Sequence, residues 1–167
     1  MKKTLLGLAL LVTMSPAMAA TTGHYVGVSL GQTNLNAPSE VEQFVSDDTD
    51  TGYKLYTGYK ITQYVAVEGY YADLGDIDLV DGSELGADTF GVSVVGSYPV
   101  NEAVDVYGKL GFNAWEADGS SDDGVDPAYG VGVSFTEGDI TLKAEYERFE
   151  MDDVDFDMAS VGIQYNF

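Results

Sequence analysis

Eight separate stretches of this chain alternate between apolar and polar residues. Successive side chains of a strand point to opposite faces, so each stretch predicts a β-strand with one apolar and one polar face. At 8 to 13 residues, the stretches exceed the ~5 to 6 residues of a typical strand and approach the ~9 to 11 of a membrane-spanning one. The predicted strands are 24–32, 53–61, 64–72, 89–98, 104–116, 129–136, 140–149 and 158–167.

The connections between these stretches differ in length in a regular way. The short ones are 62–63, 99–103 and 137–139, and the long, polar ones are 33–52, 73–88, 117–128 and 150–157. Of the 28 acidic residues, 21 lie in or beside the long connections. Short turns at one end and long loops at the other are typical of an outer-membrane barrel. The pattern therefore predicts an all-β, eight-stranded antiparallel up-and-down transmembrane barrel with one acidic rim.

The two faces of the predicted strands carry different residues. The apolar face has a single charge, Arg148, near a loop, whereas the polar face carries charges of both signs in equal number. A soluble sandwich or ligand-binding barrel would place the apolar face inside, but the strand length and the balanced charges favour the apolar face outside. We therefore predict a charge cluster in the lumen, formed by Lys54, Lys60, Glu68, Asp105, Lys109, Lys143, Glu145 and Glu147.

The first 20 residues have the features of a secretory signal peptide. Lys2 and Lys3 precede the apolar stretch 5–14, and Ala17-Met18-Ala19 resembles a cleavage site, with cleavage after Ala19 or Ala20. The apolar stretch is shorter than the ~18 to 20 residues that a membrane helix needs. We expect a cleavable leader at 1–20 and one domain at 21–167, in a chain without Cys.

Several segments resemble the transmembrane domain of OmpA-like outer-membrane proteins. The similarity is greatest at Tyr98-Pro99 followed by Asp105-Val106-Tyr107, Lys109-Leu110-Gly111 and Trp115, at Ala144-Glu145-Tyr146, at Tyr25-Val26-Gly27 with Leu30-Gly31, and at Ser160-Val161-Gly162. The resemblance covers most of 23–167 and implies an integral protein of a Gram-negative outer membrane. It also implies that Tyr165 and the terminal Phe167 form the signal that the barrel-assembly machinery recognises, although an interfacial anchor suits the same ring.

The chain departs from this family at two features. Ser29, Val95 and Ser134 stand where the family's lumen carries charges, so the gating switch of that cluster is not expected here. The sequence also stops at the barrel, so we expect neither the peptidoglycan-binding domain of longer relatives nor its tethering role.

Few residues in this chain suit catalysis or metal binding. The only histidine, His24, is expected at the end opposite the acidic loops, where an interfacial ring explains it better than catalysis. The acidic segment Asp118–Asp126 lacks the Gly and Glu positions of an EF-hand. We therefore predict no enzyme activity, no cofactor and no metal site. The net charge of −21 also argues against nucleic-acid binding.

The expected function is structural and interfacial. The barrel would contact outer-membrane lipids and lipopolysaccharide and present four acidic loops to an unidentified extracellular ligand. A small porin-like ion or solute pore is the main alternative, and an outer-leaflet lipid-modifying enzyme is a weaker one. We expect a plugged lumen, in which Lys109 and Lys143 pair with Glu68 and Glu145. Inward-pointing rings would complete the plug, from Tyr25, Tyr56, Tyr64, Tyr70, Tyr107 and Trp115.

Overall fold

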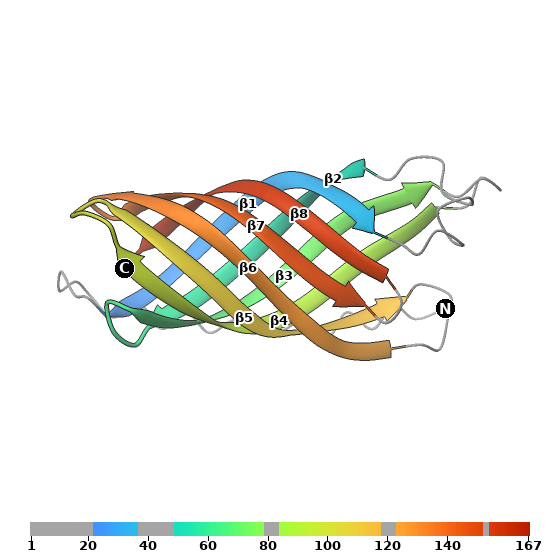
Figure 1. The fold of residues 1–167 in the computed structure, drawn as a ribbon, viewed down its shortest axis with the longest axis horizontal. Helices are drawn as coiled ribbons and strands as arrows, with labels where there is room; N and C mark the ends of the chain where they lie inside the picture. Colours follow the sequence, from blue (N-terminus) through green and yellow to red (C-terminus); the bar gives the residue numbers. More distant parts are fainter. Residues whose placement is uncertain (1–21, 37–48, 79–83, 118–122, 152–153) are drawn as a thin grey trace.

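Eight antiparallel strands close into a barrel in the computed structural model, which describes residues 22–36, 49–78, 84–117, 123–151 and 154–167 (Figure 1). The strands pair in chain order, and the last pairs with the first, so the predicted fold is confirmed. Within the described residues, no helix is long and apolar enough to cross a membrane. The strands are β1 (Gly23–Asn36), β2 (Thr49–Lys60), β3 (Val65–Asp78), β4 (Glu84–Pro99), β5 (Val104–Ala117), β6 (Asp123–Glu137), β7 (Ile140–Met151) and β8 (Val154–Asn166).

The barrel closes along β1 and β8. Tyr25 lies opposite Asn166, and the antiparallel pairing continues to the pair of Asn36 and Asp155. Beyond the end of β8, the backbone N–H of Phe167 donates a 2.9 Å hydrogen bond to the carbonyl of His24. This pairing satisfies the backbone up to the last residue, as a barrel in a bilayer requires, because backbone groups there have no water to bind.

The apolar face of every strand points away from the barrel axis, as predicted. Leu110 and Val131 are 71% and 64% exposed, whereas Lys54 and Glu68 are 0% exposed. A soluble barrel would bury the apolar set and expose the charges. The soluble alternative is therefore wrong, and the outer surface is one that hydrocarbon can cover.

The strands extend further than predicted at the end with the long connections. β1 continues to Asn36, β4 begins at Glu84 and β6 begins at Asp123. Strand pairing continues past the predicted ends, into segments where Asp and Gly residues interrupt the regular alternation that marks a strand. The predicted connections 33–52, 73–88, 117–128 and 150–157 are thus too long. The predicted leader at 1–20 and the segments 37–48, 79–83, 118–122 and 152–153 lie outside the described residues.

Three tight turns connect the strands at the opposite end, where the C-terminus also lies (Figure 1). In the first turn, the Thr62 hydroxyl accepts hydrogen bonds from the backbone N–H groups of Tyr64 and Val65, at 3.1 and 3.0 Å. This places Tyr64 in the turn, 49% exposed, so the prediction that its ring enters the lumen is wrong. In the third turn, Gly138 takes the positive φ of 61° that a tight hairpin favours in glycine.

Candidate functional site

Six of the eight predicted lumen charges meet in the middle of the barrel. They come from four strands, and because inward side chains recur at every second residue, β7 alone contributes three of them. All six side chains are buried, with exposed fractions of at most 8%. We call this group the ionic core, which consists of Lys54, Glu68, Lys109, Lys143, Glu145 and Glu147.

Each lysine of the ionic core contacts more than one glutamate. Lys109 Nζ lies 2.6 Å from Glu68 Oε1 and 2.7 Å from Glu145 Oε1. Lys143 Nζ lies 3.0 Å from Glu145 Oε1 and 3.7 Å from Glu68 Oε2. Lys54 Nζ lies 2.8 Å from Glu145 Oε2 and also pairs with Glu147. With three lysines and three glutamates the core is formally neutral, which limits the cost of burying its charges.

Tyrosine side chains complete the hydrogen bonding of this core. Tyr25 OH donates to Glu68 Oε2 at 3.0 Å, and Tyr107 OH donates to Glu145 Oε1 at 2.9 Å. Lys143 Nζ lies 4.5 Å from the centre of the Tyr56 ring and 4.9 Å from that of Tyr107, within the range of cation–π attraction. The rings therefore satisfy carboxylate oxygens and fill the space around the ammonium groups.

Each of these buried tyrosine rings lies over a glycine on a neighbouring strand. Tyr25 pairs with Gly58, and Tyr56 pairs with Gly27, across β1 and β2. A Cβ atom at either glycine would overlap the facing ring. Tyr70 over Gly91 and Tyr107 over Gly132 repeat the arrangement. The sequence alone does not predict these pairs. Both partners of each pair have inward parity, but the strand register is needed to show that they are in contact.

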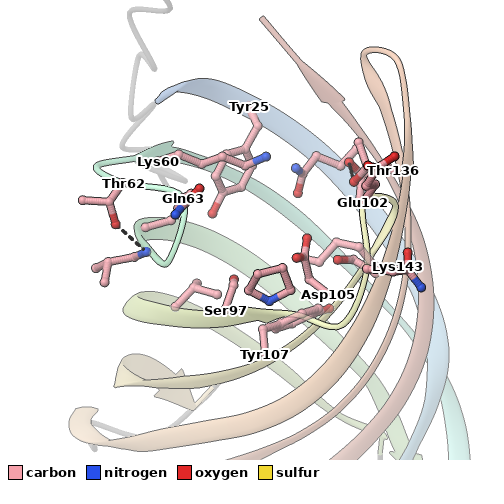
Figure 2. A pocket seen from close by; sticks show the side chains of 18 residues that line it. Tyr25, Lys60, Thr62, Gln63, Ser97, Glu102, Asp105, Tyr107, Thr136 and Lys143 are labelled. Carbon is pink, nitrogen blue, oxygen red and sulfur yellow. Dashed lines mark hydrogen bonds between the residues drawn. The ribbon is translucent and has the colours of Figure 1, made fainter. Parts of the chain in front are cut away.

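The other two predicted lumen charges, Lys60 and Asp105, lie apart from the ionic core. Both line a polar vestibule of about 330 Å³ at the turn end of the lumen (Figure 2). Lys60 Nζ donates a 3.0 Å hydrogen bond to Asn166 Oδ1. Lys143 is the one ionic-core residue among the side chains that line the vestibule. The vestibule is thus a polar mouth that leads up to the core.

Four apolar side chains are buried in the lumen on the other side of the core, toward the loop end of the barrel. Phe149 and Phe156 face each other across β7 and β8, and the ring of Tyr70 lies 5.9 Å from that of Phe149. We define the apolar layer as Leu74, Phe149, Phe156 and Met158, which are at most 4% exposed. The sequence pattern does not predict this layer, because Leu74 and Phe156 fall in stretches predicted as loops. The side chain of Trp115, predicted to point inward, lies outside the described residues.

The remaining predicted positions lie at the surface. Tyr165 and Phe167 lie side by side on the outer face, with ring centroids 5.0 Å apart. The exposed ring of His24 lies 4.8 Å from that of Tyr59, as expected of an interfacial side chain. Across the described part of the chain, no three His, Asp or Glu side chains are grouped so that they could hold a metal ion.

A closed eight-stranded barrel with an apolar outside and a charged interior is a transmembrane β-barrel. The sequence matches the outer membrane protein beta-barrel domain family over residues 4–167, and the chain belongs to this family. It is therefore an integral protein of a Gram-negative outer membrane.

The relatives and solved structures agree with this assignment. The chain is 28% identical over 198 residues to outer membrane protein A of Escherichia coli O157:H7, which covers 100% of this chain and 55% of the relative. The chain thus spans about half the length of the curated relatives it matches. The fold is similar to that of Ail from Yersinia pestis in complex with the heparin analogue sucrose octasulfate (TM-score 0.59, 20% identity, 87% of this chain and 99% of that one). It is also similar to that of Neisserial surface protein A (TM-score 0.61, 16% identity, 87% and 97%).

Proposed function

We propose that this barrel is a structural envelope protein that makes surface contacts through its acidic rim, and that it is neither an open pore nor an enzyme. The observation that carries the proposal is the double obstruction of the lumen by the ionic core and the apolar layer. A blocked lumen leaves the loop end as the part of the molecule available to extracellular partners. The single histidine, His24, lies at the opposite end, which argues against catalysis in the outer leaflet.

The charge of the rim restricts its partners. Acidic residues gather on the strand ends that lead into the long connections, namely Asp50, Asp73, Asp76, Asp78, Glu84, Asp88, Glu116, Asp123, Asp126, Glu150, Asp155 and Asp157. The solved Ail complex contains a sulfated heparin analogue, but a rim of this charge would repel such a polyanion. We expect cationic surfaces, or lipopolysaccharide bridged by divalent cations, to bind instead.

Shortening the loops tests this proposal. Replacing 37–48 and 118–122 with short Gly-Ser linkers should abolish cell contact or phage adsorption while the barrel still reaches the surface. Lengthening the turn at 100–103 by the same linker provides the control at the opposite end. Unchanged adsorption by loop-shortened cells that display normal amounts of barrel would contradict the surface role.

A small pore is the second candidate, and two observations favour it. The vestibule is open at the turn end, and buried side-chain oxygens without a hydrogen-bond partner among the described residues include those of Thr33, Ser93 and Ser160. Groups of this kind commonly bind internal water. Planar-bilayer conductance distinguishes the two functions.

Two further roles complete the proposal. Residues 1–20 direct export, and Tyr165 with Phe167 forms the signal for the barrel-assembly machinery. Their adjacent rings on the outer face of the closing strand support the second role, because they remain accessible until lipid covers them.

A further inference from the structure

The polar vestibule at the turn end of the lumen is large enough for a small molecule. Its volume of about 330 Å³ lies at the lower end of the range for small-ligand sites, which is ~300–1,000 Å³. Short turns of outer-membrane barrels are periplasmic, so the vestibule opens toward the periplasm. A ligand would therefore enter it from the side opposite the acidic rim.

Two side chains of opposite charge line the vestibule from different parts of its wall (Figure 2). Lys60 is the last residue of β2, and Asp105 follows Val104 at the start of β5. β3 and β4 lie between these two strands in the barrel. With ~4.8 Å between neighbouring strands, the backbones of β2 and β5 are about 14 Å apart around the wall. The two charges therefore belong to separate sides of one cavity.

Both charges are free of ion pairs within the described residues. Asp105 also forms no side-chain hydrogen bond with any of these residues, although it attracts Lys60 electrostatically. Lys60 Nζ donates to Asn166 Oδ1, and an ammonium group has three N–H donors. Each group can therefore bind a ligand of opposite charge without losing an existing ion pair.

The other two charged side chains of the lining are less available to a ligand. Lys143 Nζ already lies 3.0 Å from Glu145 Oε1 and 3.7 Å from Glu68 Oε2 in the ionic core. Glu102 is exposed in the turn before β5, where water solvates it. With two basic and two acidic side chains, the lining is formally neutral. It therefore favours a ligand whose own charges cancel.

An apolar strip lies between the two free charges. Ala66 on β3 and Val95 on β4 are cross-strand partners, and both line the vestibule. Lys60 is paired with Ala66 on one side of this strip. On the other side, Ser134 is the cross-strand partner of Asp105 and adds a hydroxyl group to the lining. The wall thus runs from a cation, through small apolar side chains, to an anion.

We propose that the vestibule binds a zwitterionic dipeptide with small apolar side chains. The dipeptide carboxylate pairs with Lys60, its ammonium pairs with Asp105, and its side chains lie over Ala66 and Val95. A free amino acid carries both charges on one Cα, whereas a second residue separates them by a further ~3.3–3.6 Å, as a site with its charges on separate walls requires. The proposal concerns the turn end and is independent of the surface contacts proposed for the acidic rim.

Isothermal titration calorimetry of the refolded barrel in detergent with L-alanyl-L-alanine tests the site. The parent should bind this dipeptide saturably. Two derivatives should each bind about fivefold more weakly, namely N-acetyl-L-alanyl-L-alanine, which lacks the ammonium, and L-alanyl-L-alaninamide, which lacks the carboxylate. Free L-alanine should also bind about fivefold more weakly, because one of its two charges is left without a partner.

Substitutions at the two charges show which end of the dipeptide each one contacts. Lys60→Gln should abolish the preference for the dipeptide over its amide, and Asp105→Asn should abolish the preference over the acetylated form. Lys60→Arg keeps the charge and should keep the preference. The matched control is Glu102→Gln, which removes an exposed charge from the same lining and should bind within twofold of the parent.

Four results would overturn the proposal. The first is the absence of saturable dipeptide binding by the parent. The second is equal affinity for the dipeptide and either charge-deficient derivative. The third is equal or tighter binding of free L-alanine. The fourth is an unchanged preference in the folded Lys60→Gln and Asp105→Asn variants. If a variant fails to fold, the derivatives still test both contacts on the parent, and phage adsorption through the rim is measured separately.

Discussion

At the residue scale, side-chain parity along a strand and the register between strands determine different features of the ionic core. Parity alone places Lys54, Lys109 and Glu145 inside, because every second side chain of a strand faces the same way. Which charges meet depends on the stagger between β2, β5 and β7, and stagger leaves no local mark in a sequence. The sequence therefore predicts Lys54 as a member of the cluster but does not predict that it bridges Glu145 and Glu147.

Two glycines on β5 should differ sharply in how much their replacement by alanine lowers the free energy of unfolding. A Cβ atom at inward Gly111 would overlap the Val92 carbonyl oxygen and lie 2.7 Å from Ser93 Cα, both of which are backbone atoms that cannot rotate away. We expect Gly111→Ala to lower the free energy of unfolding by about 1–3 kcal/mol through overpacking. Gly108→Ala on the same strand should change it by less than about 0.5 kcal/mol. Urea titration in lipid vesicles measures both, and equal effects would contradict the close approach of β4 and β5.

Removing one charge from the ionic core should be far costlier than removing one from the vestibule. Lys109→Met leaves three buried glutamates with two lysines, which should destabilise the barrel by about 3–5 kcal/mol. Lys60→Met removes one part-buried hydrogen bond and should cost about 1 kcal/mol. Urea titration of the two variants gives the comparison. The double variant Lys109→Met/Glu68→Gln should recover part of the loss, and a Lys109→Met cost no larger than that of Lys60→Met would show that water reaches the core.

At the element scale, the eight strands could be predicted because hydrocarbon outside and charge inside impose alternation on each one. Their loop-side ends could not, because strands such as β3 and β6 continue into segments where Asp and Gly residues interrupt the alternation. The apolar layer was missed for the same reason, since Phe156 lies in a strand end dominated by aspartates. The predicted strand boundaries at the turn end, such as 104 and 140, agree with the structure.

β8 pairs with β1 up to Asn166, so Phe167 should add little to folding. We expect it to matter more for assembly in cells. Deleting Phe167 removes one backbone hydrogen bond to His24 and one exposed ring. Refolding yield in detergent should therefore fall little, while the amount of assembled barrel in cells should fall several-fold. Replacing Tyr98, an exposed aromatic at the end of β4, with alanine controls for loss of an interfacial ring. Equal surface amounts of the deletion variant and the parent would contradict the assembly-signal role.

At the scale of the whole molecule, two groups of buried side chains, the ionic core and the apolar layer, lie one after the other along the lumen. We expect the ionic core to exclude ions that cannot displace paired charges, and the apolar layer to oppose hydration, as hydrophobic constrictions do in channels. Weakening one barrier leaves the other in place. This arrangement predicts that single substitutions will open the barrel rarely and that combined substitutions will open it often.

Planar-bilayer recordings test that arrangement directly. The parent should conduct rarely or not at all, Glu68→Ala or Phe149→Ala should add brief openings, and the double variant Glu68→Ala/Phe149→Ala should conduct far more often than either. Ser134→Ala, a lumen variant at a vestibule position, provides the control and should behave as the parent. The double variant removes a carboxylate that holds Lys109 and Lys143 and a ring that contacts Tyr70, so both barriers weaken together. A steady, large conductance from the parent would show that neither group blocks ions, and the pore would then replace the surface role as the favoured function.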